Sequence, residues 1–128
     1  MKDPTNPVCR TISTLLSRIG DKWTVLVVTT LAPSGKRFNE LRREIPSVSQ
    51  RMLTLTLRNL ERDGLVSRAV TPSIPPRVDY ALTDLGRSLV PALHALEVWA
   101  LDHVGDIHQA HARFDAEHDA ASPRAEAA

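Results

Sequence analysis

The sequence predicts an α+β fold, mostly α, of the winged helix-turn-helix type, and three observations support this prediction. A helix that begins at a capping serine, Ser49, and carries arginines on its outer side ends at Gly64. A strand, a proline-rich loop and a second strand follow, over residues 66–82. Residues 34–77 hold nine Lys and Arg against four Asp and Glu, a net charge of +5, whereas the whole chain carries only +1. A basic surface of this kind suits the phosphates of nucleic acid.

Length and composition are those of one ordinary globular domain. The chain of 128 residues is long enough for one core but too short for two domains. Its residues are 42% hydrophobic and 24% charged. Aromatic residues make up only 4%, so base-stacking sites for single-stranded nucleic acid are not expected. The single cysteine excludes an internal disulfide. The N-terminus does not have the pattern of a signal peptide, and no apolar run approaches the roughly 20 residues needed to cross a bilayer. We therefore expect a soluble cytoplasmic protein without a membrane partner.

Two helices are expected before the helix-turn-helix. Apolar residues recur at helical spacing from Cys9 to Ile19, and Gly20 ends that segment. Asp21 can cap a second helix, Lys22–Ala32, which is apolar on nearly every side. Such a helix is typical of the buried centre of a small domain.

The helix-turn-helix is expected at about residues 39–63. A short strand at Lys36–Phe38 precedes it, Asn39 caps a brief helix to Ile45, and Pro46 prevents that helix from continuing. Ser49 caps the next helix. Its inner side, at 100° per residue, is predicted to hold Leu53, Thr56, Leu57 and Leu60, and its outer side Arg51, Thr54, Leu55, Arg58 and Arg62.

A wing and a long final helix complete the predicted domain. Strands Val66–Thr71 and Val78–Leu82, joined by a proline-rich loop, form a wing at about 66–82. Thr83 caps a helix over about 84–112, whose apolar residues follow near-heptad spacing. Pro91 is expected to kink that helix or to split it near Ser88. The domain therefore spans 1–114, and the Ala/Asp/Glu-rich residues 115–128 are expected to be disordered.

Six sequence blocks occur in a fixed order along residues 20–86. They are G-D-K-W at Gly20–Trp23, R-F-N-E-L-R at Arg37–Arg42, S-Q-R-M-L at Ser49–Leu53, L-E-R-D-G-L-V at Leu60–Val66, P-P-R-V-D-Y at Pro75–Tyr80 and L-T-x-L-G at Leu82–Gly86. With these blocks the chain resembles the HxlR family of bacterial transcription regulators over about Cys9–Ala100. The resemblance implies a homodimer whose terminal helices, about 9–19 and 84–112, form the interface. It also implies recognition helices that enter successive major grooves of DNA.

The predicted DNA contacts lie on the helix after Ser49, on the wing and on the short strand that precedes the helix-turn-helix. Gln50 and Arg51 are near the helix N-terminus, where side chains reach base edges most easily. Arg77, beside the prolines of the wing, is a candidate for a phosphate or minor-groove contact. The full predicted set is Lys36, Arg37, Ser49, Gln50, Arg51, Thr54, Arg58 and Arg77. The alternative for each is an ordinary solvated side chain. Leu55 is interpreted as an exposed leucine or as a contact to a thymine methyl group or a sugar.

Cys9 is the candidate for redox sensing. The resemblance implies that several relatives respond to electrophiles or oxidants through a cysteine ahead of the G-x-K-W block, and Cys9 lies fourteen residues before Trp23. Arg10 follows it where the relatives have a proline. A helix N-terminus and an adjacent arginine both favour a thiolate, which can form a disulfide with a second subunit or a small thiol. The alternative is an inert Cys9, with a small ligand that binds near Trp23 and Trp99 as the signal.

No pattern indicates an enzyme, a cofactor or a metal site. The sequence lacks a Gly-rich phosphate loop and a nucleophile elbow, and its five histidines fall without metal-ligand spacing after residue 93. We therefore predict a transcriptional regulator that binds a palindromic operator in double-stranded DNA as a homodimer, with a small-molecule or oxidant inducer. The rival hypothesis is a winged-helix protein-interaction module without DNA binding, which the +5 segment disfavours.

Overall fold

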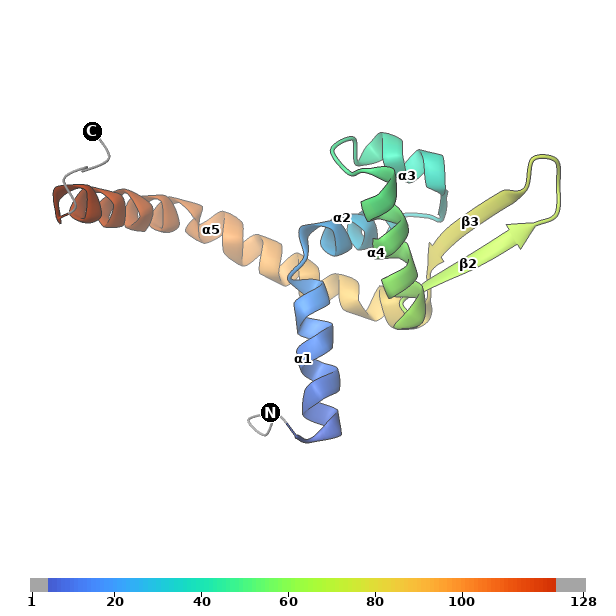
Figure 1. The fold of residues 1–128 in the computed structure, drawn as a ribbon, viewed down its shortest axis with the longest axis horizontal. Helices are drawn as coiled ribbons and strands as arrows, with labels where there is room; N and C mark the ends of the chain where they lie inside the picture. The colour runs from blue at the N-terminus through green and yellow to red at the C-terminus, as the bar shows by residue number, and fades with distance from the viewer. Residues whose placement is uncertain (1–4, 122–128) are drawn as a thin grey trace. The chain divides into compact units, whose positions relative to one another are not determined.

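The computed structural model describes residues 5–121, and the chain divides after Pro91 into two compact units. The elements are α1 (Pro7–Ile19), α2 (Lys22–Leu31), β1 (Lys36–Arg37), α3 (Phe38–Glu44), α4 (Gln50–Arg62), β2 (Val66–Thr71), β3 (Arg77–Leu82) and α5 (Asp84–Ala121). The first unit contains everything up to the first two turns of α5, and the second contains the remainder of α5. This element order is that of a winged helix-turn-helix (Figure 1).

Side-chain caps fix the starts of three helices. The Val8 N–H donates to Asn6 Oδ1 over 2.8 Å, the Trp23 N–H to Asp21 Oδ1 over 3.1 Å and the Met52 N–H to Ser49 Oγ over 3.0 Å. The caps at Asp21 and Ser49 confirm the predictions. Helix α1 begins two residues earlier than predicted, because Asn6 is its cap and Pro7 suits the first helical position.

The predicted cap at Asn39 is wrong. Arg37 is the N-cap residue of α3, and its backbone N–H donates to Oε1 of Glu40 over 2.9 Å. A glutamate at the third helical position commonly reaches back to the N-cap amide in this way. Phe38 therefore begins the helix, Asn39 lies inside its first turn, and strand β1 is limited to Lys36–Arg37.

The three strands form one antiparallel sheet in the order β1-β3-β2. Tyr80 of β3 pairs with Lys36 on one side and Arg68 on the other, so these three side chains share a face. Asp79 pairs with Arg37 and Ala69 on the opposite face. The β2–β3 hairpin extends away from α2, α3 and α4 (Figure 1), which confirms the predicted wing. Strand β3 starts at Arg77, one residue before the prediction.

The core of the first unit lies between α2, α3 and α4. The most completely buried side chains are Val27, Val28 and Leu31 of α2, Leu41 of α3, and Leu53, Leu57 and Leu60 of α4. Thr56 is also buried. The inner face of the helix after Ser49 and the central position of the second helix are therefore as predicted. This packing fixes which side of α4 remains in contact with solvent.

A set of hydrogen bonds joins the end of α4 to the start of α5. Gly64 has φ +77°, and the N–H groups of Gly64 and Leu65 donate to the carbonyls of Glu61 and Leu60, which closes α4 in a Schellman motif. Thr83 Oγ1 donates to the Gly64 carbonyl over 2.6 Å and accepts from the Gly86 N–H over 3.0 Å. Thr83 thus caps α5 as predicted and holds it against the turn that follows α4.

Helix α5 corrects two predictions about the C-terminal part. It runs through Pro91 without a break, so the predicted alternative of a split near Ser88 is wrong. A proline removes only one hydrogen bond from a 38-residue helix. The helix also continues past Phe114 to Ala121, because alanine and glutamate favour helix and the Phe114 ring stacks on His118 with centroids 3.7 Å apart. The rest of the predicted tail, 122–128, lies outside the described residues.

Candidate nucleic-acid interface

The outer face of α4 carries four of the predicted contact residues. Gln50, Arg51, Thr54 and Arg58 are all exposed, opposite the buried side of the helix. Leu55 lies among them with 52% of its surface exposed. Ser49 has a structural role, since its Oγ caps the helix. The result is a polar, basic strip along one side of α4, which the core holds in a fixed orientation.

The turn before α4 fixes the position of the helix N-terminus. Ile45 and Val48 are buried at 4% and 3% exposure, and the Val48 N–H donates to the Ile45 carbonyl over 3.1 Å. These two apolar residues anchor the turn on the core while Gln50 and Arg51 remain in solvent. The buried turn residues thus orient the side chains best placed to reach base edges.

The other end of α4 is tied to α1. Arg18 Nη1 lies 2.9 Å from Asp63 Oδ2 and donates to the Asn59 carbonyl over 3.4 Å. Both charged side chains are largely buried, at 18% and 21% exposure. Arg18 therefore stabilises the C-terminal turn of α4 through the carbonyl and the carboxylate together.

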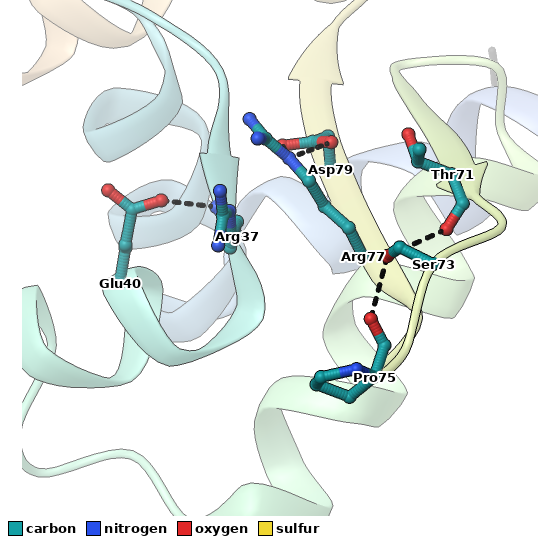
Figure 2. A network of polar contacts seen from close by, with 7 residues as sticks. All are labelled: Arg37, Glu40, Thr71, Ser73, Pro75, Arg77 and Asp79. Carbon is teal, nitrogen blue, oxygen red and sulfur yellow. Dashed lines mark hydrogen bonds and ion pairs between the residues drawn. The ribbon is translucent and has the colours of Figure 1, made fainter.

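A groove of about 1260 Å³ separates the hairpin from the start of α3, and three arginines line it. They are Arg37, Arg43 and Arg77, accompanied by Glu40 and Asp79. Figure 2 shows Arg37 and Arg77 reaching out from neighbouring parts of the sheet, with the Asp79 carboxylate beside Arg77. Arg77 Nε donates to both Asp79 oxygens, over 2.9 and 3.3 Å. The Asp79 contact orients Arg77 through Nε, and the groove has a basic lining.

A second hollow of about 350 Å³ lies between α4 and the hairpin. Thr54 and Arg58 of α4 line it together with Arg68 and Tyr80 of the strands. Arg68 is not among the contact residues predicted from the sequence. Alternation along β2 could have identified it, because Val66 is buried and Arg68, two residues later, lies on the same face. Arg43, in the first groove, is also absent from the predicted set of contacts.

The remaining predicted residues have more protected positions. The Lys36 side chain is 17% exposed, and its Nζ lies 3.5 Å from Oε2 of Glu44. Cys9 lies in the first turn of α1 and is buried, with 9% exposure. Trp23 of α2 is half-buried with Lys22 Nζ over its ring, and Trp99 of α5 stacks on His103. The structure thus places Thr54 and Arg58 of α4 in the second hollow and Arg37 and Arg77 together in the first groove, and Cys9 lines neither.

Two further observations concern residues 5–121 alone. No three or more His, Cys, Asp and Glu side chains in this range gather into a group that could hold a metal ion. None of the helices within it combines the length and apolar character that crossing a membrane requires.

Comparisons with known proteins agree with this geometry. The model of the HxlR-like helix-turn-helix family matches residues 18–108. An HTH-type transcriptional regulator of Methanothermobacter thermautotrophicus is 49% identical over 88 residues, which cover 69% of this chain and 67% of that protein. The structure of the redox regulator HypR in its reduced form is 40% identical, with a TM-score of 0.71 over 77% of this chain and 98% of HypR. The reduced form of the transcriptional regulator YodB from Bacillus subtilis is 34% identical, with a TM-score of 0.64 over 70% of this chain and 88% of YodB.

These similarities establish the family and the general function. The matched region contains the helix-turn-helix, the hairpin and much of α5, and the proteins matched are transcriptional regulators. No catalytic family is indicated by them. The protein has the DNA-binding fold of a transcriptional regulator. The chain belongs to the HxlR-like helix-turn-helix family.

Proposed function

We propose that the protein binds a palindromic operator as a homodimer, with α4 of each subunit in the major groove. The observation that carries this proposal is the division of α4 into a buried apolar face and an exposed face with Gln50, Arg51, Thr54 and Arg58. A 13-residue helix is about 20 Å long. The major groove of B-form DNA, roughly 12 Å wide, admits such a helix.

The positions of the side chains suggest distinct roles. Gln50 and Arg51, in the first turn of α4, are suited to base edges, since Gln pairs with adenine and Arg with guanine. Arg77 in the first groove and Arg68 in the second are suited to phosphates on either side of the hairpin. In this arrangement α4 supplies sequence preference and the hairpin supplies general affinity.

The test is selection of preferred duplexes from a random pool, followed by titration of the selected and a random duplex at one fixed salt concentration. Arg51→Ala is expected to reduce the ratio of the affinity for the selected duplex to that for the random duplex by roughly tenfold, because a lost bidentate base contact costs about 1–3 kcal/mol. Arg87→Ala is the matched control, because Arg87 is exposed but belongs to α5. An unchanged ratio in Arg51→Ala would contradict the base-reading role.

The rival hypothesis of a protein-interaction module makes a different prediction. Such a module would show no binding to random duplex even at low salt, where phosphate contacts are strongest. The arginines of both grooves favour DNA instead, because a basic lining on each side of one hairpin matches a polyanion.

The dimer part of the proposal rests on exposed apolar side chains. Residues 92–121 form one helix, and a lone helix cannot bury its own apolar stripe. Seven large apolar side chains on it are 37–67% exposed, namely Leu96, Val98, Trp99, Leu101, Val104, Ile107 and Phe114. Val8 and Leu16 of α1 are 65% and 53% exposed. A second copy of the chain would cover these surfaces, and sedimentation of Ile107→Glu should then show a shift from dimer to monomer.

For the inducing signal we propose oxidation of Cys9. The observation that favours this signal is the similarity to HypR, a redox regulator known in reduced and oxidised forms. Cys9 is the only cysteine, so oxidation joins either two Cys9 residues of a dimer or Cys9 and a small thiol. Its burial implies that α1 must move before the thiol reacts, because a thiolate attacks only where it is accessible.

The sensing proposal is tested by DNA release. Diamide or hypochlorite should release the wild-type protein from its selected duplex, and dithiothreitol should restore binding. Cys9→Ser should remain bound under the same treatment. Equal release of both proteins would overturn the role of Cys9 and leave the small-ligand alternative, which thermal shift with small aromatic compounds can examine.

A further inference from the structure

The tip of the hairpin carries a fully exposed isoleucine. Ile74 has a relative exposure of 102%, the highest among the exposed large apolar residues of the described chain. It lies in the loop between Thr71 and Arg77, at the end of the hairpin that is farthest from α4 (Figure 1). A single exposed isoleucine on an ordinary surface needs no explanation. The loop that holds Ile74, however, is stiff, and arginines line the groove beside it.

The loop that carries Ile74 is stiff. Three of its residues are prolines, Pro72, Pro75 and Pro76, whose rings fix φ. Ser73 Oγ, next to Ile74, donates to the Pro75 carbonyl over 2.7 Å and lies 3.5 Å from the Thr71 carbonyl (Figure 2). Because the loop is ordered before any partner arrives, contact through Ile74 costs little further conformational entropy.

The charges around the tip point to a polyanionic partner. The groove that Ser73, Pro75 and Pro76 of the loop help to line also holds three arginines, Arg37, Arg43 and Arg77, against two acids. The partner must therefore combine dense negative charge with a narrow recess that accepts an apolar side chain. The minor groove of duplex DNA has these properties, since it is roughly 6 Å wide, lies between phosphate rows and accepts apolar wedges such as isoleucine.

We propose that Ile74 is an apolar wedge that enters the DNA minor groove beside the major groove occupied by α4. This inference rests on the proposed function and deepens it. A wedge of this kind partly unstacks one base step, which is easiest at the flexible pyrimidine–purine steps TA and CA. The hairpin would then add a sequence preference of its own, separate from the base contacts of α4.

The first experiment compares two matched substitutions on the selected duplex. Ile74→Thr should weaken binding by about tenfold (about 1.4 kcal/mol). Val70→Thr replaces another exposed β-branched residue, in the strand instead of the tip, and should bind as the wild type does. Ile74→Thr should leave the dependence of log K on log salt unchanged, because no phosphate contact is lost. Thermal unfolding of both variants should match the wild type, since Ile74 is fully solvated.

The second experiment locates the wedge. Replacing guanine by inosine at the step beneath the hairpin removes the N2 amino group from the minor groove and leaves the major-groove edge unchanged. The substituted duplex should bind the wild type more tightly and Ile74→Thr no differently. 2-Aminopurine at the same step should brighten with the wild type only, because unstacking relieves its quenching.

The outcomes separate this inference from the function on which it rests. If Ile74→Thr binds like the wild type while Arg51→Ala still loses sequence preference, the wedge is wrong and the regulator proposal stands. If Ile74→Thr binds weakly but inosine and 2-aminopurine report no difference, Ile74 acts outside the minor groove and the inference is also overturned. If selection enriches no duplex, both proposals fail.

Discussion

Replacing Gly86 by alanine should destabilise the first unit, although alanine is the better helix former. Gly86 lies in the first turn of α5 and is buried. A Cβ added there would overlap the carbonyl oxygen of Leu65 and lie 3.0 Å from its carbonyl carbon. The same oxygen accepts the Thr83 N–H over 3.1 Å, so the crowded atom belongs to the hydrogen-bonded junction of α4 and α5.

The magnitude follows from two opposing effects. Alanine in a helix gains about 0.5–1 kcal/mol over glycine. Overpacking a well-packed site costs about 1–3 kcal/mol, and a cost near 3 kcal/mol is expected because a backbone carbonyl cannot rotate away as a side chain can. The net loss is therefore about 2 kcal/mol in the free energy of unfolding. For a unit of this size it corresponds to roughly 10 °C in the melting temperature.

The assay is urea unfolding followed by circular dichroism, at one fixed protein concentration because a dimer's stability depends on concentration. Gly105→Ala is the matched control: Gly105 also lies within α5, but nothing is within 4 Å of its added Cβ. That variant should gain about 0.5–1 kcal/mol. If Gly86→Ala proved as stable as the wild type, the close packing of α5 on the Leu65 carbonyl would be refuted.

Three further predictions follow from individual contacts. A double-mutant cycle of Arg18→Ala and Asp63→Ala should give a coupling energy of about 1 kcal/mol by urea unfolding, since the pair is largely buried, and zero coupling would contradict the ion pair. Ser49→Ala should cost about 1 kcal/mol of stability through the lost cap, whereas Ser49→Asp, which can also cap, should recover most of it. Arg77→Ala should weaken selected and random duplexes alike and reduce the salt slope by about 0.9, and a loss confined to the selected duplex would reverse its role.

The sequence predicted the helix-turn-helix well because its determinants are local. The burial of Leu53, Leu57 and Leu60 follows from helical periodicity alone. The caps at Asp21 and Ser49 and the left-handed conformation of Gly64 follow from the chemistry of single residues. These features also fix the exposed face of α4, so the α4 part of the candidate interface is predictable from periodicity and capping alone.

Features that depend on pairing between distant segments were not predictable in the same way. Arg68 lines the hollow beside α4 only because β2 and β3 pair in a register that places it next to Tyr80. Lys36 meets Glu44 only because α3 packs against β1. The start of α3 depends on a choice between two possible caps. The Arg37 N–H donates to Glu40, so the helix begins after Arg37 and not after Asn39. Each of these three features depends on three-dimensional geometry, which the periodicity of the sequence does not determine.

The acids beside the arginines of the two grooves have a consequence for general affinity in the proposed complex. Asp79 and Glu40 share the first groove with Arg37, Arg43 and Arg77, and Glu61 shares the second hollow with Arg58 and Arg68. Binding to random DNA depends almost entirely on phosphate contacts, so each carboxylate near the backbone lowers the affinity for every sequence. Hydrogen bonds from Gln50 and Arg51 to base edges form only on the correct sequence and are not offset in this way. The carboxylates of the two grooves therefore lower random and operator binding by about the same free energy, and the difference between the two affinities depends on the base contacts of α4.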